Sequence, residues 1–267
     1  MKIPANYHTH STLCDGSSTM QEMAEVAYKK GFSYLGFSGH MDADVHMDME
    51  EYKRQIRELQ DKYRGKMDIL CGVELDLLYD PSCAVGLDYI IGSTHFLDVE
   101  FERPLSIDDK PEDVVLLCNE FFDGNYYKLS KAYFELESQV YDRTHCTFVG
   151  HFDLVTRFNS ELHVFDEESK KFLYPAFEAM SNLVGKGIPF EINTRQSHNG
   201  KLFPSLIMLK QLHEMGGEVV ISSDAHNKNE LDKGFDLAVL VARNAGFDHV
   251  NILKKHGFVQ FCQIGII

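Results

Sequence analysis

The side chains best suited to chemistry in this sequence are imidazoles and carboxylates at the ends of short apolar runs. Five of seven such runs carry histidine at or near their ends, and a sixth carries glutamate. One buried histidine usually has a structural explanation, but six do not, because each neutral imidazole needs its own hydrogen-bond partner. Such ligands without thiolates suit Zn, Fe or Mn. The polar residues at the run ends are His8, His10, His40, Glu74, His95, His151, Asn193, Asp224 and His226.

Spacing within the runs strengthens this interpretation. Residues i and i+2 of a strand point to the same side, so His8 with His10 can clasp one site, as can Asp224 with His226. The His-x-His motif alone is weak, since a random shuffle of this composition gives about 0.6 such pairs. The set is also too large for one ion of about four to six ligands, so we expect two or three ions, with Glu74 as a candidate bridge.

Seven apolar runs must position these residues. Each run is short and rich in β-branched or aromatic side chains, as buried parallel strands are. Between the runs, a capping box at Thr19, a cap at Asp48, a first-turn proline at Pro204 and an apolar stripe over 231–246 predict amphipathic helices. The predicted strands are 2–10, 33–40, 68–76, 87–95, 146–153, 188–194 and 217–226.

Strands that alternate with helices predict an α/β fold with a parallel sheet, and 267 residues favour a closed (β/α) barrel over an open sheet. We therefore expect a single TIM-like barrel domain over 1–267, with all C-terminal strand ends at one mouth. About fifty residues separate His95 from Thr147, enough for two helices, one after Pro111 and one over 125–140. This helical insert after the fourth strand either shapes the substrate pocket or covers the outside of the barrel.

The composition excludes several classes of partner. The chain has 26 Lys and Arg against 41 Asp and Glu, a formal net charge of −15, which repels phosphate backbones and anionic membranes. We expect no nucleic-acid and no membrane partner. No run of 18 apolar residues appears, and the first residues lack the apolar stretch of a secretion signal. Six scattered cysteines without a CxxC pair indicate reduced thiols, so we expect a cytoplasmic protein.

Taken in order, these motifs resemble the PHP (polymerase and histidinol phosphatase) family of metal-dependent phosphoesterases. The matching segments span residues 7–226, nearly the whole chain. The resemblance implies a distorted seven-stranded barrel with a trinuclear metal centre. The matching segments are YHTHS with Asp15 following, SGH ending at His40, GVELD with Glu74, GSTHF with His95, GHFDLV with His151, and SSDAH with Asp224 and His226.

The resemblance also implies which residues hold each ion. Asp15 departs from family members that place a histidine at this position. A harder oxygen ligand is expected to alter the metal preference or to weaken the third site. The implied sets are His8, His10, Glu74 and Asp224 for the first ion, Glu74, His95 and His151 for the second, and Asp15, His40 and His226 for the third.

Within the family the sequence most resembles the histidinol-phosphate phosphatases, through its stand-alone length and the segments FFDGNYYKLSKAY and GHFDLVTRFN. The resemblance implies that a small phosphate ester, L-histidinol phosphate, is hydrolysed to L-histidinol and phosphate in histidine biosynthesis. The nucleophile would be a metal-bridging water of lowered pKa. Arg157 and Arg195 are candidate phosphate ligands, and His198 is a candidate phosphate ligand or general acid.

Several polar residues near the predicted strands have open roles. His46, Asp42 and Asp44 follow the second strand and are candidates to line the pocket, although the Asp44-x-His46 spacing itself is interpreted as accidental. Glu191 lies within the strand at 188–194 and suits either the support of a metal ligand or the barrel interior.

Three other functions remain possible at this point. The first is a PHP phosphoesterase for another ester, such as a nucleotide, an oligonucleotide end or phosphotyrosine. The second is a non-catalytic metal-binding or regulatory module, which predicts gaps in the ligand set, and the sequence shows none. The third is a metal-dependent amidohydrolase, which normally needs a lysine bridging the ions, and no predicted strand end offers one.

Overall fold

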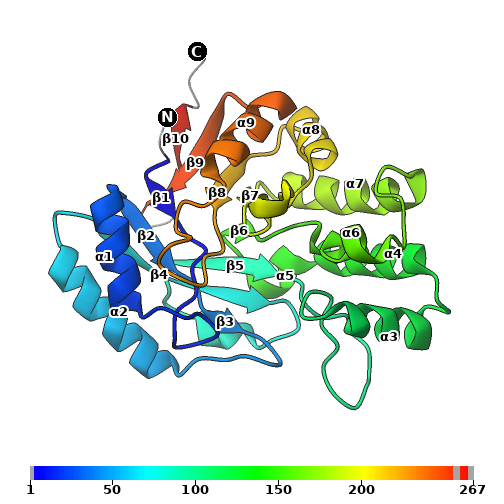
Figure 1. Cartoon of the computed structure of the whole chain (residues 1–267), viewed down its shortest axis with the longest axis horizontal. Coiled ribbons are helices and arrows are strands. Elements are labelled where there is room, and N and C mark those ends of the chain that lie inside the picture. Colours follow the sequence, from blue (N-terminus) through cyan, green and yellow to red (C-terminus); the bar gives the residue numbers. More distant parts are fainter. Residues whose placement is uncertain (1–2, 255–258, 264–267) are drawn as a thin grey trace.

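The computed structural model describes residues 3–254 and, for the backbone alone, 259–263. Within these residues seven parallel strands form a nearly closed barrel, in the order β1-β2-β4-β5-β6-β7-β8 (Figure 1). The prediction of a seven-stranded α/β barrel is confirmed, and a single domain over 1–267 stays a prediction. The strands are β1 Ala5–Asn6, β2 Tyr34–Phe37, β4 Asp68–Asp76, β5 Tyr89–Ser93, β6 Phe148–Val149, β7 Phe190–Asn193 and β8 Val219–Ser222.

The barrel closes where the first strand meets the last. Just beyond β1 and β8, Thr9 forms a parallel bridge with Ala225. The backbone N–H of His10 donates to the carbonyl of Ala225 at 2.8 Å, and that of Ala225 donates to the carbonyl of His8 at 3.2 Å. Residues about 215 positions apart in the sequence are thereby brought side by side at the mouth.

Tyr89 fills the centre of the barrel. Its ring is fully buried, and a Cβ atom placed at Gly36 or Gly72 would lie within 2.3 Å of it, so both positions require glycine. The Tyr89 hydroxyl donates to the carbonyl oxygens of Tyr7, at 2.5 Å, and Phe37, at 2.9 Å. The interior is therefore a packed core and not a channel.

Helices cover the outside of the barrel, and most of their predicted caps are confirmed. Thr19 and Glu22 form the capping box of α1, and Asp48 caps α2. The prediction for Pro204 is wrong, because Ser205 is the N-cap of α8 and the proline therefore precedes the helix. The predicted 231–246 helix begins later, after Gly234, whose positive φ breaks the helix there. These helices are α1 Met20–Lys30, α2 Met49–Tyr63, α7 Lys170–Gly185, α8 Leu206–Glu214 and α9 Phe235–Ala245.

The insert between β5 and β6 contains three helices, α3 Pro111–Phe121, α4 Tyr126–Glu137 and α5 Val140–Thr144. In Figure 1 they extend to one side of the barrel, where α4 lies next to α7. The segment at 97–110 precedes them and reaches the mouth, where Ile107 N–H donates to the carbonyl of His95 at 2.9 Å. The 97–110 segment of the insert therefore lies at the mouth, whereas α4 lies beside the barrel helix α7.

Three strands were not predicted. The short strand β3, His40–Met41, pairs with β4 so that His40 lies opposite Glu74. An antiparallel pair, β9 His249–Leu253 and β10 Val259–Gln263, follows α9. The hydroxyl of Tyr7 donates to the carbonyl of Leu253 at 2.8 Å and ties β9 to the first strand. Among the described residues, no helix combines the length and apolar character needed to cross a bilayer.

Candidate metal centre

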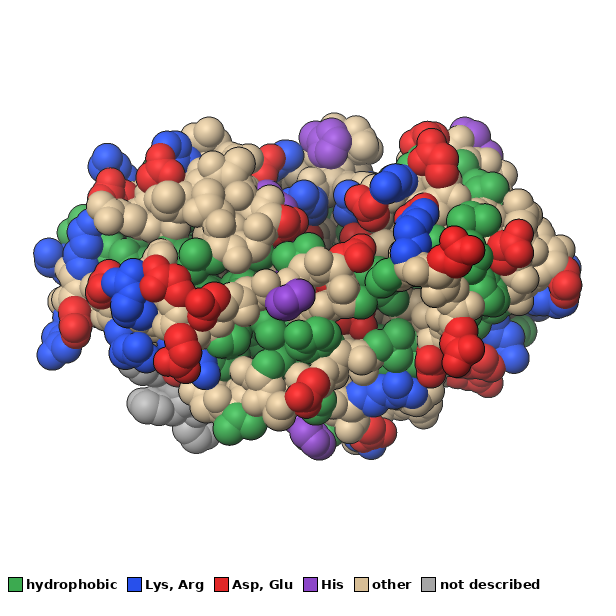
Figure 2. Space-filling view, turned by 90° about the horizontal axis from the view of Figure 1, so that it is seen from below, with side chains coloured by type: hydrophobic (Ala, Val, Ile, Leu, Met, Phe, Trp, Pro, Cys, Tyr) green, Lys and Arg blue, Asp and Glu red, His purple; other side chains and the backbone are tan. Residues whose placement is uncertain are grey.

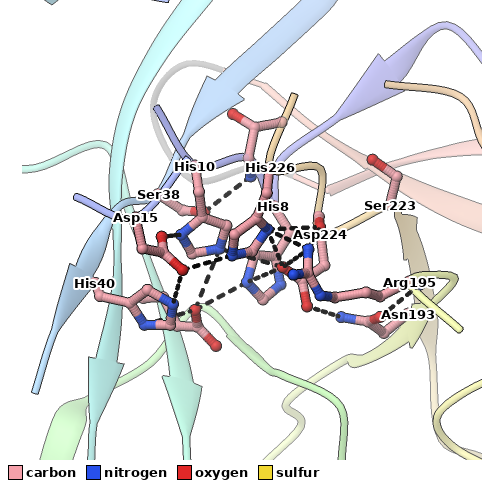
Figure 3. A network of polar contacts seen from close by, with 12 residues as sticks. His8, His10, Asp15, Ser38, His40, Asn193, Arg195, Ser223, Asp224 and His226 are labelled. Atoms are coloured by element: carbon pink, nitrogen blue, oxygen red, sulfur yellow. Dashed lines mark hydrogen bonds and ion pairs between the residues drawn. The ribbon is translucent and has the colours of Figure 1, made fainter. Parts of the chain in front are cut away.

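The predicted ligands meet at the C-terminal ends of the strands, and Figure 3 shows His8, His10, His40 and His226 close to Asp15 and Asp224. The Glu74 carboxylate lies within the same cluster. Glu74 lies near the end of the nine-residue strand β4, and its side chain is almost completely buried. Both carboxylate oxygens face imidazole nitrogens, as expected of a bridging ligand. Oε2 lies 3.0 Å from His8 Nε2, 3.4 Å from His10 Nε2 and 3.2 Å from His40 Nδ1, and Oε1 lies 2.7 Å from His151 Nε2 and 3.2 Å from His95 Nε2.

All nine predicted ligands fall into compact groups whose ligand atoms lie within 4.8 Å of one another. One group contains the whole third set implied by the family resemblance, with His10 added. Another places His151 with His8 and Asp224 instead of with His95, so the division of ligands among ions stays a prediction. The groups are His10, Asp15, His40 and His226; His8, His151 and Asp224; His8, His10 and Glu74; and His40, Glu74 and His95.

The nitrogen and oxygen atoms that face one another in these groups are suited to binding divalent cations. His8 Nε2, His10 Nε2 and Asp224 Oδ1 are buried and make no hydrogen bond within the described residues. Buried polar atoms without a partner are costly, and several of them facing one another at a barrel mouth have no structural benefit. Imidazole nitrogen and carboxylate oxygen are the ligands that Zn, Fe and Mn accept, so bound ions would satisfy these atoms.

The protonation states of Glu74 and His10 also suit metal binding. Burial by itself would raise the pKa of Glu74, but the His8, His40 and His95 side chains hold it well below its usual range. Burial, reinforced by the neighbouring His226 and His40, lowers the pKa of His10 to about 3. Glu74 is therefore anionic and His10 neutral near pH 7, which are the forms that bind a cation.

Asp15 reaches the group that the family resemblance implied for it. Its Oδ2 lies 2.8 Å from His226 Nε2 and 3.8 Å from His40 Nε2, and its Oδ1 lies 3.5 Å from His10 Nδ1. The loop that carries it turns at Gly16, where a Cβ atom would lie 2.4 Å from the carbonyl oxygen of His10. Glycine at this position lets the loop fold back tightly enough for Asp15 to face the histidines.

A second layer of carboxylates orients the histidines from behind. Glu191 Oε1 lies 2.8 Å from His8 Nδ1, which resolves the choice left open for this residue in favour of ligand support. Asp76 Oδ2 accepts a hydrogen bond from the backbone of His95 at 2.8 Å and lies 3.5 Å from its Nδ1. Sequence reasoning missed Asp76, although its i+2 spacing from Glu74 places both on one face of β4.

Two further residues support the centre, and only one of them, Asn193, was predicted. Ser93, also missed, donates its hydroxyl to Glu74 Oε1 at 2.8 Å. Asn193 donates to Glu191 Oε2 at 3.0 Å and lies 3.3 Å from Asp224 Oδ2, so it contacts ligands and their supports. Asn193 therefore holds neighbouring carboxylates in place.

A cavity of about 260 Å³ opens over the predicted metal ligands, and Arg157 and Arg195 both line it. Arg157 Nη1 lies 3.5 Å from Asp108 Oδ2, and Arg195 Nη1 donates to the carbonyl of Asp224 at 2.8 Å. His198 is exposed on a short 3-10 helix, Ser197–Asn199, and is not among the residues lining the cavity. The structure thus brings both arginines to the site but not His198.

Part of the cavity wall is acidic. Asp42 and Asp44 line it, whereas His46 is exposed and not among the lining residues. The 97–110 segment adds Ser106, Asp108 and Asp109, and Phe96 lies beside them. In Figure 2, acidic and basic side chains gather around a hollow in the face seen from below.

Comparison with known proteins agrees with this geometry. The model of the PHP domain matches residues 6–195, which is more than half of the chain. The chain belongs to the PHP domain family. This result confirms the family proposed from the strand-end motifs. The assignment of the strand-end residues as metal ligands stays a prediction.

Among similar proteins, a "probable histidinol-phosphatase" of Schizosaccharomyces pombe is 25% identical over 283 residues, covering 95% of this chain and 90% of the relative. A histidinol-phosphatase of Bacillus subtilis is 23% identical, covering 86% of this chain and 96% of the relative. Histidinol phosphate phosphatase from Lactococcus lactis, solved with Zn, L-histidinol and phosphate, superposes with a TM-score of 0.75 at 20% identity, covering 96% and 98% of the two chains.

Proposed function

We propose that this PHP-family protein is a metal-dependent phosphomonoesterase that hydrolyses L-histidinol phosphate to L-histidinol and phosphate. The observation that carries the proposal is that the cluster of buried imidazoles and carboxylates lies next to two arginines in one cavity. Relatives named histidinol-phosphatase align along nearly the whole chain, which supports this substrate over other esters.

Divalent ions in the centre would neutralise the phosphoryl oxygens and lower the pKa of a bound water to near neutrality. Three such ions carry a formal charge of +6 against −3 from Asp15, Glu74 and Asp224, so the floor of the cavity suits a phosphate dianion. We propose two to three Zn, Fe or Mn ions, held by the nine ligands of the site.

The arginines are placed to hold the phosphate from the side. The Arg157 side chain is about one quarter exposed, and its ionic partner among the described residues, Asp108, is at 3.5 Å. The Arg157 Nε is buried without a hydrogen-bond partner there, so the guanidinium has donors left for an anion. Arg195 is held more tightly, by the carbonyl of Asp224 and by contact with His226. We assign Arg157 to phosphate binding, and Arg195 to phosphate binding and to holding the Asp224 loop.

The acidic wall suits the alcohol part of this substrate. L-histidinol phosphate carries an amino group and an imidazole, and both attract carboxylates when protonated. The Asp44 carboxylate has no hydrogen-bond or ion-pair partner among the described residues, and burial together with Asp42 and Asp109 raises its pKa. A cation from the substrate would relieve this repulsion. The same wall, in a chain of net charge −15, disfavours long polyanions.

A panel of phosphomonoesters tests the proposal. The purified protein, loaded with Zn²⁺, Mn²⁺ or Fe²⁺ in turn, is assayed on L-histidinol phosphate, nucleoside monophosphates and phosphotyrosine. We expect kcat/KM to be at least about tenfold higher for L-histidinol phosphate, because the nucleotides lack its amino group and imidazole, and phosphotyrosine lacks the imidazole and adds a carboxylate that the acidic wall repels. A higher kcat/KM for a nucleotide or for phosphotyrosine would overturn the proposed substrate and favour a phosphoesterase for that other ester. We further propose a cytoplasmic location, in keeping with the unpaired cysteines among the described residues.

A further inference from the structure

Glu137, the last residue of α4 in the insert, is a buried acid that the proposed reaction does not use. Its side chain is 1% exposed, and no lysine or arginine pairs with it among the described residues. Oε2 accepts a hydrogen bond from the hydroxyl of Thr94, whereas Oε1 is buried without a hydrogen-bond partner. Burying a carboxyl group so far from solvent destabilises the fold, so its presence here indicates a purpose other than stability.

The partner of Glu137 lies between two residues of the metal centre. Ser93 and His95, on either side of Thr94, both face Glu74: the Ser93 hydroxyl donates to Oε1 at 2.8 Å and His95 Nε2 lies 3.2 Å from the same oxygen. Alternate residues of an extended chain point to opposite sides, so the Thr94 side chain points away from the centre and toward the insert.

The insert also packs against the same strand. A Cβ atom at Gly92 would lie 2.8 Å from Val140 Cγ2 and 2.8 Å from Cys146 Cβ, so β5 and the end of the insert are in direct contact. This packing fixes the strand laterally. The hydrogen bond to Glu137 adds a fixed point at Thr94, where the strand ends and the ligands begin.

We propose that Glu137 is a positioning residue of the metal centre. By holding Thr94, it fixes the end of β5 so that the side chains of Ser93 and His95 both contact the Glu74 carboxylate. The affinity of the centre for metal therefore depends on the helical insert. The inference rests on the metal centre of the proposed function and not on the identity of the substrate. Loss of a hydrogen-bonding group behind a ligand weakens metal binding by about tenfold or more.

Zinc titration of the metal-free protein against a chromophoric chelator tests this. We expect Glu137→Ala and Thr94→Val each to weaken one class of zinc sites about tenfold, and the double variant to be no weaker than either single one, because the two side chains act through one bond. Glu137→Gln keeps an acceptor for Thr94 and should bind zinc within about twofold of the wild type. Ser130→Ala is the control. Ser130 is buried in the same helix, and its hydroxyl donates to the carbonyl of Tyr127 and not to the metal centre, so this variant should bind zinc like the wild type.

The outcomes separate positioning from a merely structural role. Wild-type zinc affinity in Glu137→Ala, with or without a lower unfolding temperature, overturns the proposal. Equal loss in Glu137→Gln and Glu137→Ala also overturns it, because the hydrogen bond would then not be what matters. If Glu137→Ala fails to fold, Thr94→Val alone decides. Because zinc binding is measured without substrate, failure to hydrolyse L-histidinol phosphate would overturn the proposed function and leave this inference standing.

Discussion

Glu191 and His8 form a fully buried pair behind the metal centre, with 2.8 Å between Glu191 Oε1 and His8 Nδ1. Burial lowers the pKa of His8, but Glu191, Glu74 and Asp224 raise it more, so the net shift is upward in the metal-free protein. When an ion replaces the proton on Nε2, the hydrogen bond from Nδ1–H to Glu191 fixes the tautomer in which Nε2 is free to bind the ion. Glu191, a residue of β7, therefore fixes the orientation of a predicted metal ligand at the mouth of the barrel.

The first prediction follows from this pair. Glu191→Gln keeps the size of the side chain but removes the charge that fixes the His8 tautomer, so zinc affinity should fall about 10- to 100-fold. Titration of the metal-free variant against a chelator measures this change. Glu120→Gln, which alters an exposed carboxylate on α3, serves as the control. An unchanged zinc affinity in Glu191→Gln would show that His8 needs no support from Glu191.

Substitutions at Arg157 and at His198, both predicted from the sequence to act on the substrate, should affect activity differently. Arg157 lines the cavity, so Arg157→Ala should lower kcat/KM at least about tenfold, with metal content unchanged. His198 is exposed and is not a lining residue, so His198→Ala should keep kcat/KM within about twofold. Steady-state kinetics and elemental analysis check both. A large loss of kcat in His198→Ala would restore the role of general acid to this residue.

The acidic wall should set specificity more than rate. Asp109→Asn and Asp44→Asn should each raise KM for L-histidinol phosphate several-fold, because each removes a charge that faces the cationic alcohol. Hydrolysis of p-nitrophenyl phosphate, which has no cationic group, should change little in the same variants. If KM rises equally for both esters, the wall acts on the phosphate end and not on specificity.

The buried carboxyl of Glu137 should make the stability of the metal-free protein depend on pH. Burial raises the pKa of this carboxyl to about 8. Between the ordinary glutamate pKa and pH 8 the unfolded chain has released this proton while the folded chain retains it, so its contribution to stability falls as pH rises. Wild type should therefore lose stability relative to Glu137→Gln between about pH 5 and pH 8. Urea unfolding of both proteins across this range measures the difference, and parallel pH profiles would contradict it.

Most of the candidate ligands could be predicted because they stand at strand ends, whereas Asp15, in the turn between β1 and α1, was found only through the family resemblance. His8, His95 and Asp224 each end or follow a buried apolar run, and parallel strands of a barrel deliver such ends to one mouth. Their local sequence is enough to place them, since strand direction and alternation fix the side on which each residue lies.

Residues defined by distant partners could not be predicted in this way. Glu137 stands in an ordinary amphipathic helix beside Phe134 and Leu136, and nothing nearby reveals that Thr94, 43 positions earlier, is its partner. The β9 strand was missed for a similar reason, because its position depends on packing against β8 and on the bond from Tyr7 to Leu253. Tertiary contacts decide both cases, and sequence periodicity does not encode them.

The junction between Thr9 and Ala225 sets an order of events during synthesis. Two of the four ligand groups join residues before position 16 to residues after position 223, so they are complete only when the barrel has closed. A chain still being made offers the groups around Glu74 early, but it offers those containing Asp224 or His226 only after its last third has left the ribosome. Full metal loading is therefore a late step that reports a finished barrel, and a chain truncated before Asp224 would lack it.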